Sequence, residues 1–417
     1  MKSVELFAGA GGLGLGLSLS GFEPSIVIEW DKWACDTIRE NKSAGYPLVK
    51  SWNIFQGDAR KFNFSSMNDQ IDLISGGPPC QPFSLGGKHK AYNEKRDMFP
   101  IAVDAVRKLS PRAFIFENVK GITRTAFSNY FQYILLQLSY PELVKGKDED
   151  WQSHHSRLER HKTSGSTSGL TYNVIARVLN AANYGVPQNR ERVFIVGFRH
   201  DQNQEWSFPN PTHSLDKLLH DQWISTDYWD KHKISSKHKP DISSKYLNRV
   251  RKLSQACLLD SNLKPWRTVR DAIYDLPDPL SIQEHMLNQH DHKYQKGAKS
   301  YPGHTGSNLD LPAKTLKAGD HGVPGGENML VKPDGSVRYF TIRESARLQT
   351  FPDGYKFHGS WTETMRQLGN AVPVHLAQII GSSVASQLLK SQEQKIRMEY
   401  STNPYEDRRS IQSIRQE

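Results

Sequence analysis

A cysteine set between prolines is the most chemically suggestive feature of the sequence. Residues 76–82 read Gly-Gly-Pro-Pro-Cys-Gln-Pro and follow the apolar run Ile71–Ser75. The prolines restrict the backbone and would present the Cys80 thiolate rigidly at a strand end, as a nucleophile requires. The alternative is a buried cysteine that acts as a small apolar residue. Because buried cysteines seldom lie between prolines at a strand end, we predict that Cys80 is a nucleophile. Cys35 and Cys257, in predicted helical stretches, are predicted to be structural.

A glycine-rich loop suggests a cofactor site. Residues 9–14 read Gly-Ala-Gly-Gly-Leu-Gly directly after the apolar run Val4–Phe7, and Glu29 ends the next run about 20 residues on. Glycines let a cofactor approach the backbone, and the carboxylate can accept hydrogen bonds from ribose hydroxyls. A loop that only packs a helix on a sheet is the alternative. The order of strand, loop, helix and acid favours a nucleoside cofactor, but this motif alone fits NAD and S-adenosylmethionine equally.

Two further strand ends carry charged side chains. Glu117 follows the apolar run Ala113–Phe116, and a carboxylate there needs a partner or a function because burying it unpaired is costly. Arg190 and Arg192 enter another run and point to the same side of it because strand side chains alternate. Taken alone, Glu117 would more often be a helix-capping or surface acid, and a solvated strand start explains the two arginines equally well.

The elements that would position these residues alternate between strand and helix. Apolar runs of strand length are Val4–Phe7, Ser25–Ile28, Ile71–Ser75, Ala113–Phe116 and Arg192–Phe198. Stretches with helical spacing are Trp33–Asn41, Met98–Leu109 and Asn173–Ala182. This alternation predicts an α/β fold with a doubly wound, mostly parallel, Rossmann-like sheet. Ligands of such sheets bind at the carboxyl ends of the strands, where the candidate residues lie.

Composition limits the classes of protein to consider. The 417 residues are 37% hydrophobic and 24% charged, which excludes collagen and disordered chains. Three cysteines without a close pair argue against a disulfide framework or a zinc site and favour the cytoplasm. No stretch approaches 18 consecutive apolar residues, and the first apolar run begins at Val4, so we expect neither a membrane segment nor a signal peptide. A formal charge of +10 suggests a polyanionic partner.

The character of the sequence predicts domain boundaries. Residues 1–199 would form the first domain, with a polar surface insertion at 140–170. Residues 200–345 would form a second, smaller and irregular domain, and residues 346–390 would return to the first, with an amphipathic helix at Leu376–Leu389. Residues 391–417 read as a polar tail, frayed from about Gln392. Histidine pairs occur at 154–155 and at 290 and 292, but no ligand pattern surrounds them, so we predict no metal site.

Six motifs in one order carry a family resemblance. They are Phe7-Ala-Gly-Ala-Gly-Gly, Pro78-Pro-Cys-Gln-Pro-Phe-Ser84, Glu117-Asn-Val119, Gln188-x-Arg-x-Arg192, Arg343-Glu-Ser-Ala-Arg347 and Gln367-Leu-Gly-Asn-Ala-Val-Pro373. This set resembles that of the C5-cytosine DNA methyltransferases of bacterial restriction–modification systems, from about residue 3 to 390 except the insertion and about 200–310. The resemblance implies S-adenosylmethionine as cofactor, double-stranded DNA as partner and residues 200–345 as the target-recognition domain. It also implies a bacterial cytoplasmic enzyme, monomeric and without a metal, with a paired restriction endonuclease as a further partner.

The resemblance implies a role for each matching residue. In the cofactor site, Phe7 would stack on adenine, and the backbone of Ala8, Gly9 and Gly11 would line the methionine portion. Glu29 would bind the ribose with Trp30 beside the base, and Asp58 with Ala59 would reach the adenine amino group. The pocket would be completed by Pro79, Asn370 and Val372. In the catalytic site, Cys80 would attack, Glu117 would contact ring N3, and Arg192 would contact the base carbonyl with Arg190 in support. DNA would contact Gln81, Ser84, Lys88 and Thr315, the last from the Thr315-Leu316 pair, and the basic stretch from Ser84 to about Asp97 would close on it.

The implied chemistry suits these residue types. Cytosine C5 is a poor nucleophile until a thiolate adds at C6, and charge that then develops at N3 can be stabilised by a carboxylic acid. The base must leave the helix for C6 to be reached. Three alternative functions remain. The first is an RNA-methylating relative, whose Cys-Phe-Thr signature is not found. The second is an NAD-dependent oxidoreductase, which the cysteine and arginine motifs disfavour, and the third is an inactive DNA-binding module, which is disfavoured because every catalytic position is filled.

Overall fold

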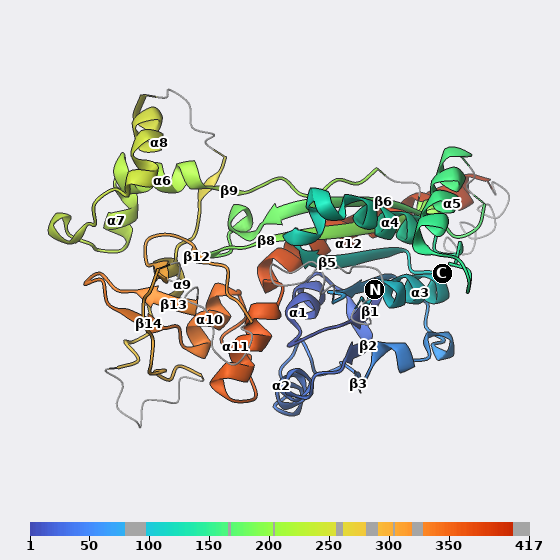
Figure 1. Ribbon diagram of the computed structural model, residues 1–417, viewed down its shortest axis with the longest axis horizontal. Coiled ribbons are helices and arrows are strands. Elements are labelled where there is room, and N and C mark those ends of the chain that lie inside the picture. The colour runs from blue at the N-terminus through green and yellow to red at the C-terminus, as the bar shows by residue number, and fades with distance from the viewer. Residues whose placement is uncertain are drawn as a thin grey trace, which may run out of the picture.

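Strands and helices alternate through the first half of the chain, and mostly short elements follow residue 200 before the long C-terminal helix (Figure 1). The computed structural model describes residues 1–79, 97–165, 168–202, 205–255, 262–280, 291–302, 305–318 and 328–402. Within these ranges the strands are β1 (Lys2–Leu6), β2 (Glu23–Glu29), β3 (Ile54–Gln56), β4 (Leu73–Gly76), β5 (Ala113–Val119), β6 (Tyr172–Asn180), β7 (Gln188–Asn189), β8 (Glu191–Arg199), β9 (His213–Ser214), β10 (Lys264–Pro265), β11 (Ser307–Asn308), β12 (Ala313–Lys314), β13 (Met329–Val331) and β14 (Val337–Tyr339). The helices are α1 (Gly12–Leu19), α2 (Lys32–Ser43), α3 (Phe99–Leu109), α4 (Ser128–Ser139), α5 (Trp151–Thr163), α6 (Leu215–Trp223), α7 (Asp227–Lys231), α8 (Ser244–Gln255), α9 (Val269–Ile273), α10 (Ile342–Leu348), α11 (Trp361–Asn370) and α12 (Val374–Thr402).

A seven-stranded sheet organises the first half of the chain. Its order is β3-β2-β1-β4-β5-β8-β6; the first five strands are parallel, and β8 runs antiparallel to both β5 and β6. The predicted doubly wound, mostly parallel α/β sheet is therefore confirmed. The strand order reverses between β1 and β4, so the loops after these strands leave the same edge side by side, where ligands of such sheets bind.

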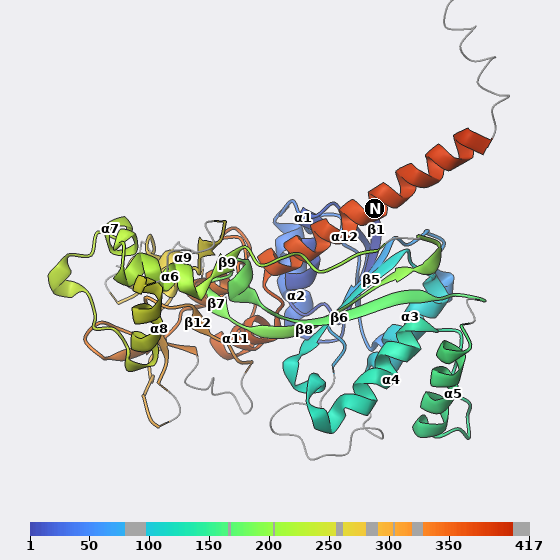
Figure 2. The same ribbon diagram turned by 90° about the horizontal axis from the view of Figure 1, so that it is seen from above.

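Apolar side chains bury both faces of the sheet. Leu17 of α1 and Leu376 of α12 pack with Ile115 on one face. Phe99 of α3 and Ile134 of α4 belong to the core of the opposite face. Figure 2 shows α1 and α12 along one face and α3 and α4 along the other. The carboxyl edge between these layers is held rigidly from both sides.

The stretch Asn173–Ala182 is a strand rather than the predicted helix. β6 covers Tyr172–Asn180, and a 3₁₀ turn follows at Ala181–Tyr184. Asn173, Ile175 and Arg177 are exposed while their neighbours are buried or half-buried, which is the period of a strand. The apolar spacing also suited a helix, but β-branched residues and full pairing with β8 favour the strand.

The C-terminal helix is longer than predicted. α12 begins at Val374, passes the predicted fraying point at Gln392 and continues to Thr402. Residues 391–399 contain good helix formers and neither glycine nor proline, which accounts for the extension. By length and composition the stretch Trp361–Gln394 could cross a membrane, but 56% of its apolar window is buried inside the protein, as in a core helix.

The predicted insertion at 140–170 contains an ordered helix. Asp150 caps α5 by accepting a hydrogen bond from the Ser153 N–H, and His154 and Leu158 are buried. His154 is bonded through Nδ1 to the Tyr133 hydroxyl at 2.8 Å, which joins α5 to α4. The described part of this polar segment is thus packed onto the sheet layer.

The elements from β9 to α11 form a second lobe beside the sheet (Figure 1). It contains the three-stranded sheet β11-β13-β14 and the pair β9-β10. β12 pairs in parallel with β7, which directly precedes β8 of the large sheet. Met365 and Leu368 of α11 pack with Ile38 of α2. The second lobe is therefore fastened to both ends of the large sheet's carboxyl edge.

Candidate active site

The glycine-rich loop after β1 has an unusual backbone. Phe7 and Gly9 both have φ of 55°, and Gly11 has φ of 86°. Glycine adopts these left-handed values readily, whereas a bulky residue such as Phe7 is strained there. Strain of this kind clusters at ligand sites, where the surrounding structure holds it in place. The loop therefore shows a local feature expected of a cofactor site.

Glu29 is bonded to the backbone of this loop and of its own turn. Its Oε2 accepts from the Gly9 N–H at 2.7 Å, and its Oε1 accepts from the N–H groups of Trp30 and Asp31, both at 2.8 Å. Burial raises the pKa of Glu29, and the three N–H groups act in the opposite direction. A carboxylate has about four acceptor positions, so one is left for a ligand hydroxyl. Trp30 beside it is 75% exposed, an aromatic face open to a ligand.

Asp58 lies after β3 and has a partner already. Its Oδ1 accepts from the Arg60 backbone N–H at 3.0 Å, and its Oδ2 is 2.6 Å from Arg60 Nη2. Arg60 lowers the pKa of Asp58. Ala59 next to it is buried. Contact with an adenine amino group would therefore require Asp58 to share its oxygens with Arg60.

The C-terminal motif closes over the glycine loop. An ideal Cβ at Gly12 would lie 2.4 Å from the carbonyl oxygen of Val372, so only glycine permits this approach. The Tyr355 hydroxyl donates to the Ala10 carbonyl at 2.9 Å from the same side. Asn370 is exposed at the end of α11. Val372 and Asn370 thus lie at the edge where the sequence predicted them.

A buried ion pair occupies the end of β5. Arg192 Nε lies 2.9 Å from Glu117 Oε1, and both side chains are at most 14% exposed. Burial raises the pKa of Glu117, while Arg192 and Arg190 act in the opposite direction. Glu117 Oε2 is 3.5 Å from the position of an ideal Cβ on Gly77, in the turn that leads to Cys80. A carboxyl group and a guanidinium are therefore placed together at the expected strand ends.

The turn after β4 is held at both sides of the segment that follows it. Asn118 Nδ2 donates to the Pro78 carbonyl at 2.8 Å, and the Met98 N–H donates to the Pro79 carbonyl at 3.1 Å. The exposed Pro79 is the last described residue before this segment. The predicted nucleophile and three predicted DNA contacts lie outside the described residues: Cys80, Gln81, Ser84 and Lys88.

Arg190 has a structural role that sequence reasoning did not foresee. It is fully buried, and its guanidinium donates to the carbonyls of Leu316 at 3.1 Å, Gly369 at 2.9 Å and Ala371 at 2.8 Å. It therefore acts near Arg192 but makes its hydrogen bonds to backbone. One side chain joins the sheet, the second lobe and the C-terminal segment.

Gln188 was missed as a candidate and fixes the Thr315-Leu316 pair. Its Oε1 accepts from the Leu316 N–H at 3.0 Å, and its Nε2 donates to the Leu348 carbonyl at 3.2 Å. The Thr315 hydroxyl donates to the Asn189 carbonyl at 2.8 Å. Gln188 is fully buried, and its place at the head of the Gln188-x-Arg-x-Arg192 motif was the available signal.

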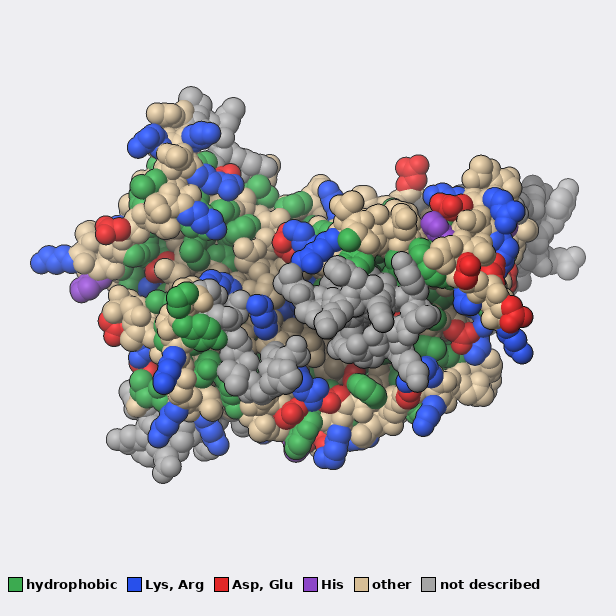
Figure 3. Space-filling model, in the orientation of Figure 1, with side chains coloured by type: hydrophobic (Ala, Val, Ile, Leu, Met, Phe, Trp, Pro, Cys, Tyr) green, Lys and Arg blue, Asp and Glu red, His purple; other side chains and the backbone are tan. Residues whose placement is uncertain are grey.

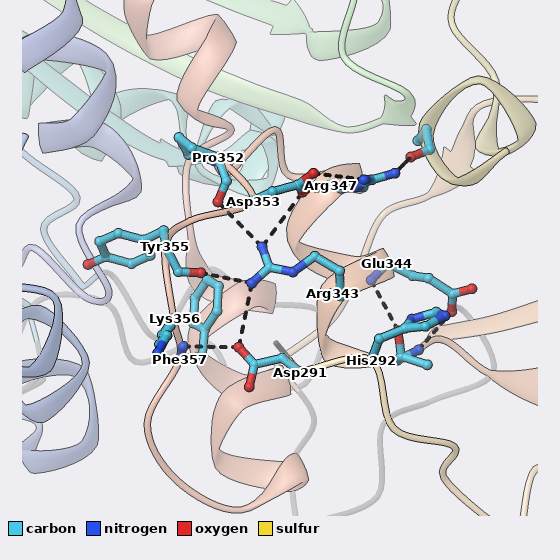
Figure 4. A network of polar contacts seen from close by, with 12 residues as sticks. Asp291, His292, Arg343, Glu344, Arg347, Pro352, Asp353, Tyr355, Lys356 and Phe357 are labelled. Atoms are coloured by element: carbon cyan, nitrogen blue, oxygen red, sulfur yellow. Dashed lines mark hydrogen bonds and ion pairs between the residues drawn. The ribbon is translucent and has the colours of Figure 1, made fainter. Parts of the chain in front are cut away.

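The Arg343–Arg347 motif organises the loop that carries Tyr355 (Figure 4). Arg343 donates to the carbonyls of Pro352 and Tyr355 at 3.3 and 3.0 Å and lies 3.6 Å from Asp291 of the second lobe. Arg347 pairs with Asp353 at 2.7 Å. This network links residues near the Ala10 carbonyl to the second lobe.

The histidines have structural partners. His292 is buried between the Thr341 hydroxyl and the Pro277 carbonyl, both at 2.8 Å, and His154 is bonded to Tyr133. Within the part of the chain that is described, no group of three or more His, Cys, Asp or Glu side chains could hold a metal ion. His290 lies outside the described residues.

Comparison with known proteins covers nearly the whole chain. The sequence model of the family described as C-5 cytosine-specific DNA methylase matches residues 1–140 and 152–386. Only residues 141–151 interrupt the match, a shorter gap than the predicted insertion. Type II methyltransferase M.PspPI of Psychrobacter sp. is 31% identical over 92% of this chain and 79% of its own, and M.Eco47II of Escherichia coli is 29% identical over 93% and 79%.

Two solved structures share the fold. A putative DNA modification methyltransferase encoded within an E. coli prophage superimposes with a TM-score of 0.56 at 20% identity, over 93% of this chain and 99% of its own. The Dnmt2 methyltransferase of S. pombe gives a TM-score of 0.53 at 16% identity, over 94% and 99%. At these sequence identities the similarity shows a shared fold and nothing further.

Proposed function

The chain belongs to the C-5 cytosine-specific DNA methylase family and is a DNA cytosine-5-methyltransferase, and from this we propose how its residues divide the reaction. In the proposal, Cys80 adds to C6 of a cytosine flipped out of a short, specific duplex sequence, and a methyl group from S-adenosylmethionine is transferred to C5. Family membership rules out the oxidoreductase alternative and favours DNA over RNA as substrate.

The residues around the glycine loop fit the cofactor. The strained Phe7 and the left-handed Gly9 and Gly11 leave backbone open to a ligand, and Glu29 keeps one acceptor position for a ribose hydroxyl. Trp30 offers an exposed ring for the adenine. S-adenosylmethionine, when bound, supplies an electrophilic methyl group. We assign Phe7, Ala8, Gly9, Gly11, Glu29, Trp30, Asp58, Ala59, Pro79, Asn370 and Val372 to this site.

Glu117 and Arg192 are proposed to hold the cytosine ring. Burial raises the pKa of Glu117, which favours the protonated carboxyl that can donate to N3 as charge develops there. Arg192, which stays charged, would donate to the neighbouring carbonyl oxygen. Arg190 positions both by joining the adjacent backbone segments and does not itself contact the base. This separates one positioning residue from two that touch substrate.

The covalent steps balance with these groups. The Cys80 thiolate forms a bond to C6 while the ring electrons move toward N3, where Glu117 donates its proton. C5, now electron-rich, takes the methyl group, and S-adenosylhomocysteine is released. A base removes the C5 proton, the Cys80–C6 bond breaks, and Glu117 recovers the N3 proton. Gln81, Ser84, Lys88 and Thr315 are proposed to contact the DNA around the extruded base.

The observation that carries the proposal is the Glu117–Arg192 pair beside the turn that leads to Cys80. Bisulfite sequencing of plasmid from a host that expresses the protein should show 5-methylcytosine in one sequence context. Plasmid from cells expressing Cys80→Ala should show none, and Cys35→Ala should match the wild type apart from a modest loss of stability. Unmodified plasmid from wild-type cells, with methylated RNA instead, would contradict the proposal.

A trapping experiment tests Cys80 directly. A duplex with 5-fluorocytosine at the target allows addition and methyl transfer but blocks loss of the C5 substituent. The enzyme should therefore stay attached under denaturing conditions only when S-adenosylmethionine is present, and peptide mapping should locate the adduct at Cys80. An adduct that survives in Cys80→Ala would refute this assignment.

The remaining assignments concern partners. The curated relatives are Type II methyltransferases, which suggests a restriction endonuclease with the same target sequence. We propose a monomer that acts in the bacterial cytoplasm. Resistance of the modified plasmid to a co-encoded nuclease tests the paired endonuclease. Sedimentation of the purified chain tests whether it is a monomer.

A further inference from the structure

Positive charge is concentrated in one short part of the second lobe. Residues 231–255 contain eight Lys or Arg and one Asp, so these 25 residues carry a formal charge of +7 (eight minus one) out of +10 for the whole chain. They begin at the last residue of α7 and end with α8. Figure 3 shows Lys and Arg side chains gathered over α8 and the neighbouring α6. A concentration of this size needs an explanation beyond solubility.

Three of the four cations of α8, Lys245, Arg251 and Lys252, lie away from its packing side. Val250 is buried, and Tyr246 and Leu253 are half-buried, so these three define the inner face of the helix. Lys245, Asn248, Arg251 and Lys252 are exposed and spaced by three and four residues, which places them together on the outer face. Like charges at such spacing repel one another and destabilise an isolated helix.

Three neighbouring acidic groups are already paired with cations that are not part of this outer face. Asp216 pairs with Arg249 at 2.5 Å, Asp221 with Lys217 at 2.7 Å, and Asp271 with Lys231 at 2.6 Å. Among the described residues, the cations of this segment that form no ion pair are Lys233, Lys237, Lys239, Lys245, Arg251 and Lys252. The outer face is therefore free for an anionic partner.

The subdomain that carries this face is tied to the Thr315 segment. α6 and α7 share a core of Leu218, Tyr228 and Trp229, and Leu311 packs against it. Gln222 Nε2 donates to the Asp310 carbonyl at 2.6 Å, five residues before Thr315. A ligand held by α8 is thus held by the same rigid unit that presents Thr315.

We propose that the outer face of α8, with the lysines of residues 233–239, binds the phosphate backbone of the substrate duplex beyond the base pairs that are read. This rests on the proposed function, because it assigns the face to the same DNA. Regularly spaced phosphates suit several cations in a row, and Asn248 can donate to a phosphate oxygen as well. The linkage to Thr315 favours DNA over an anionic membrane.

The experiment compares two variants with equal change in charge. The test variant is Lys245→Ala with Arg251→Ala and Lys252→Ala, in which alanine preserves helix propensity. The control is Lys50→Ala with Lys147→Ala and Lys390→Ala, exposed cations outside the second lobe. Circular dichroism verifies that both fold. Affinity is measured over a salt series for duplexes of about 12 and 30 base pairs that contain the methylated sequence.

The test variant should bind the long duplex more weakly, with a log–log salt slope reduced by up to about 2.7, since each lost phosphate contact removes about 0.9. The short duplex should show a smaller change, and turnover at saturating DNA should be unaltered. An unchanged slope, an equal loss in the control, or a loss confined to binding of phosphatidylserine vesicles overturns the inference. If the wild type binds DNA through this face but methylates no cytosine, the proposed function fails, and the face is a DNA-binding surface without a substrate role.

Discussion

Glu5 is a buried acidic residue beneath the cofactor loop. It lies in β1 with 1% exposure, and its Oε1 accepts from the Gly14 N–H at 2.9 Å. Burial raises the pKa of Glu5 from 4.5 to about 8, and nearby Glu29 adds to the effect. At neutral pH the folded chain therefore holds a proton that the unfolded chain releases.

This predicts a fall in stability with rising pH. Between about pH 4.5 and 8 Glu5 is protonated to a greater extent in the folded state than in the unfolded state, so its contribution to the free energy of unfolding decreases as pH increases. Glu5→Gln keeps an acceptor for Gly14 and removes the ionisation. It should therefore be more stable than the wild type at pH 8, by on the order of a few kcal/mol, and similar to it at pH 5.

Urea denaturation at both pH values measures the difference. Glu23→Gln serves as control because Glu23 is exposed and paired with Lys2. A gap between Glu5→Gln and wild type that is the same at pH 5 and pH 8 would show that Glu5 is ionised in both states.

At the residue scale, the sequence located side chains whose chemistry is visible in a motif. Glu117 and Arg192 were predicted from separate runs and lie 2.9 Å apart. Gln188 and Glu5 were not found, because their roles depend on which backbone groups the fold brings near them. A sequence pattern of residue types and spacings does not say which distant backbone groups will lie near a side chain. Cys80 is predicted from sequence and lies outside the described residues.

At the element scale, close backbone contacts hold the C-terminal motif in place. Gly369 of α11 is buried, and an ideal Cβ there would lie 2.2 Å from the Ala318 backbone nitrogen. The Gly369 carbonyl also accepts from Arg190 at 2.9 Å. A side chain at this position would force α11 away from the segment that follows Thr315.

Gly369→Ala tests this contact by the sign of its effect. Helix propensity alone would favour alanine by about 1 kcal/mol, whereas the steric conflict should destabilise by about 1–3 kcal/mol and lower the methylation rate. Thermal unfolding and a methylation assay measure both. Gly146→Ala, at an exposed position where an ideal Cβ would make only ordinary contacts with Glu149 at 3.4 Å or more, should change neither. A more stable Gly369→Ala would mean that the two backbones can separate without cost.

Element boundaries were predictable where the spacing of apolar residues fitted only one type of secondary structure. The α2 and α3 predictions fall within one residue or two of Lys32–Ser43 and Phe99–Leu109. The stretch that became β6 has apolar residues that suit either period, and pairing with β8 decided it. Long-range pairing of this kind cannot be read from a local window.

At the scale of the whole molecule, contacts around β7 join the second lobe to the large sheet. Arg190 donates to the Leu316 carbonyl at 3.1 Å, and the Thr315 hydroxyl donates to the Asn189 carbonyl at 2.8 Å. Trp206, inside the range of about 200–310 that the family resemblance does not cover, donates to the Ser383 hydroxyl of α12 at 2.9 Å. An exchange of that whole range would therefore remove a contact with the C-terminal helix, which packs on the large sheet.

A narrower exchange should transfer specificity intact. Replacing about residues 213–310 with the corresponding segment of M.PspPI, while keeping Asp291 and His292, leaves Trp206, Gln188, Arg190 and Thr315 in place. The glycine loop lies outside the exchanged segment, so binding of S-adenosylmethionine should remain within about twofold of the wild type by calorimetry. Bisulfite sequencing should show cytosine methylated in the context set by the donor segment. Restoring the native segment is the control. If the chimaera binds the cofactor normally but still modifies the original sequence, recognition resides in the retained residues. If cofactor binding is lost while the fold is retained, the two lobes are coupled more tightly than these contacts indicate.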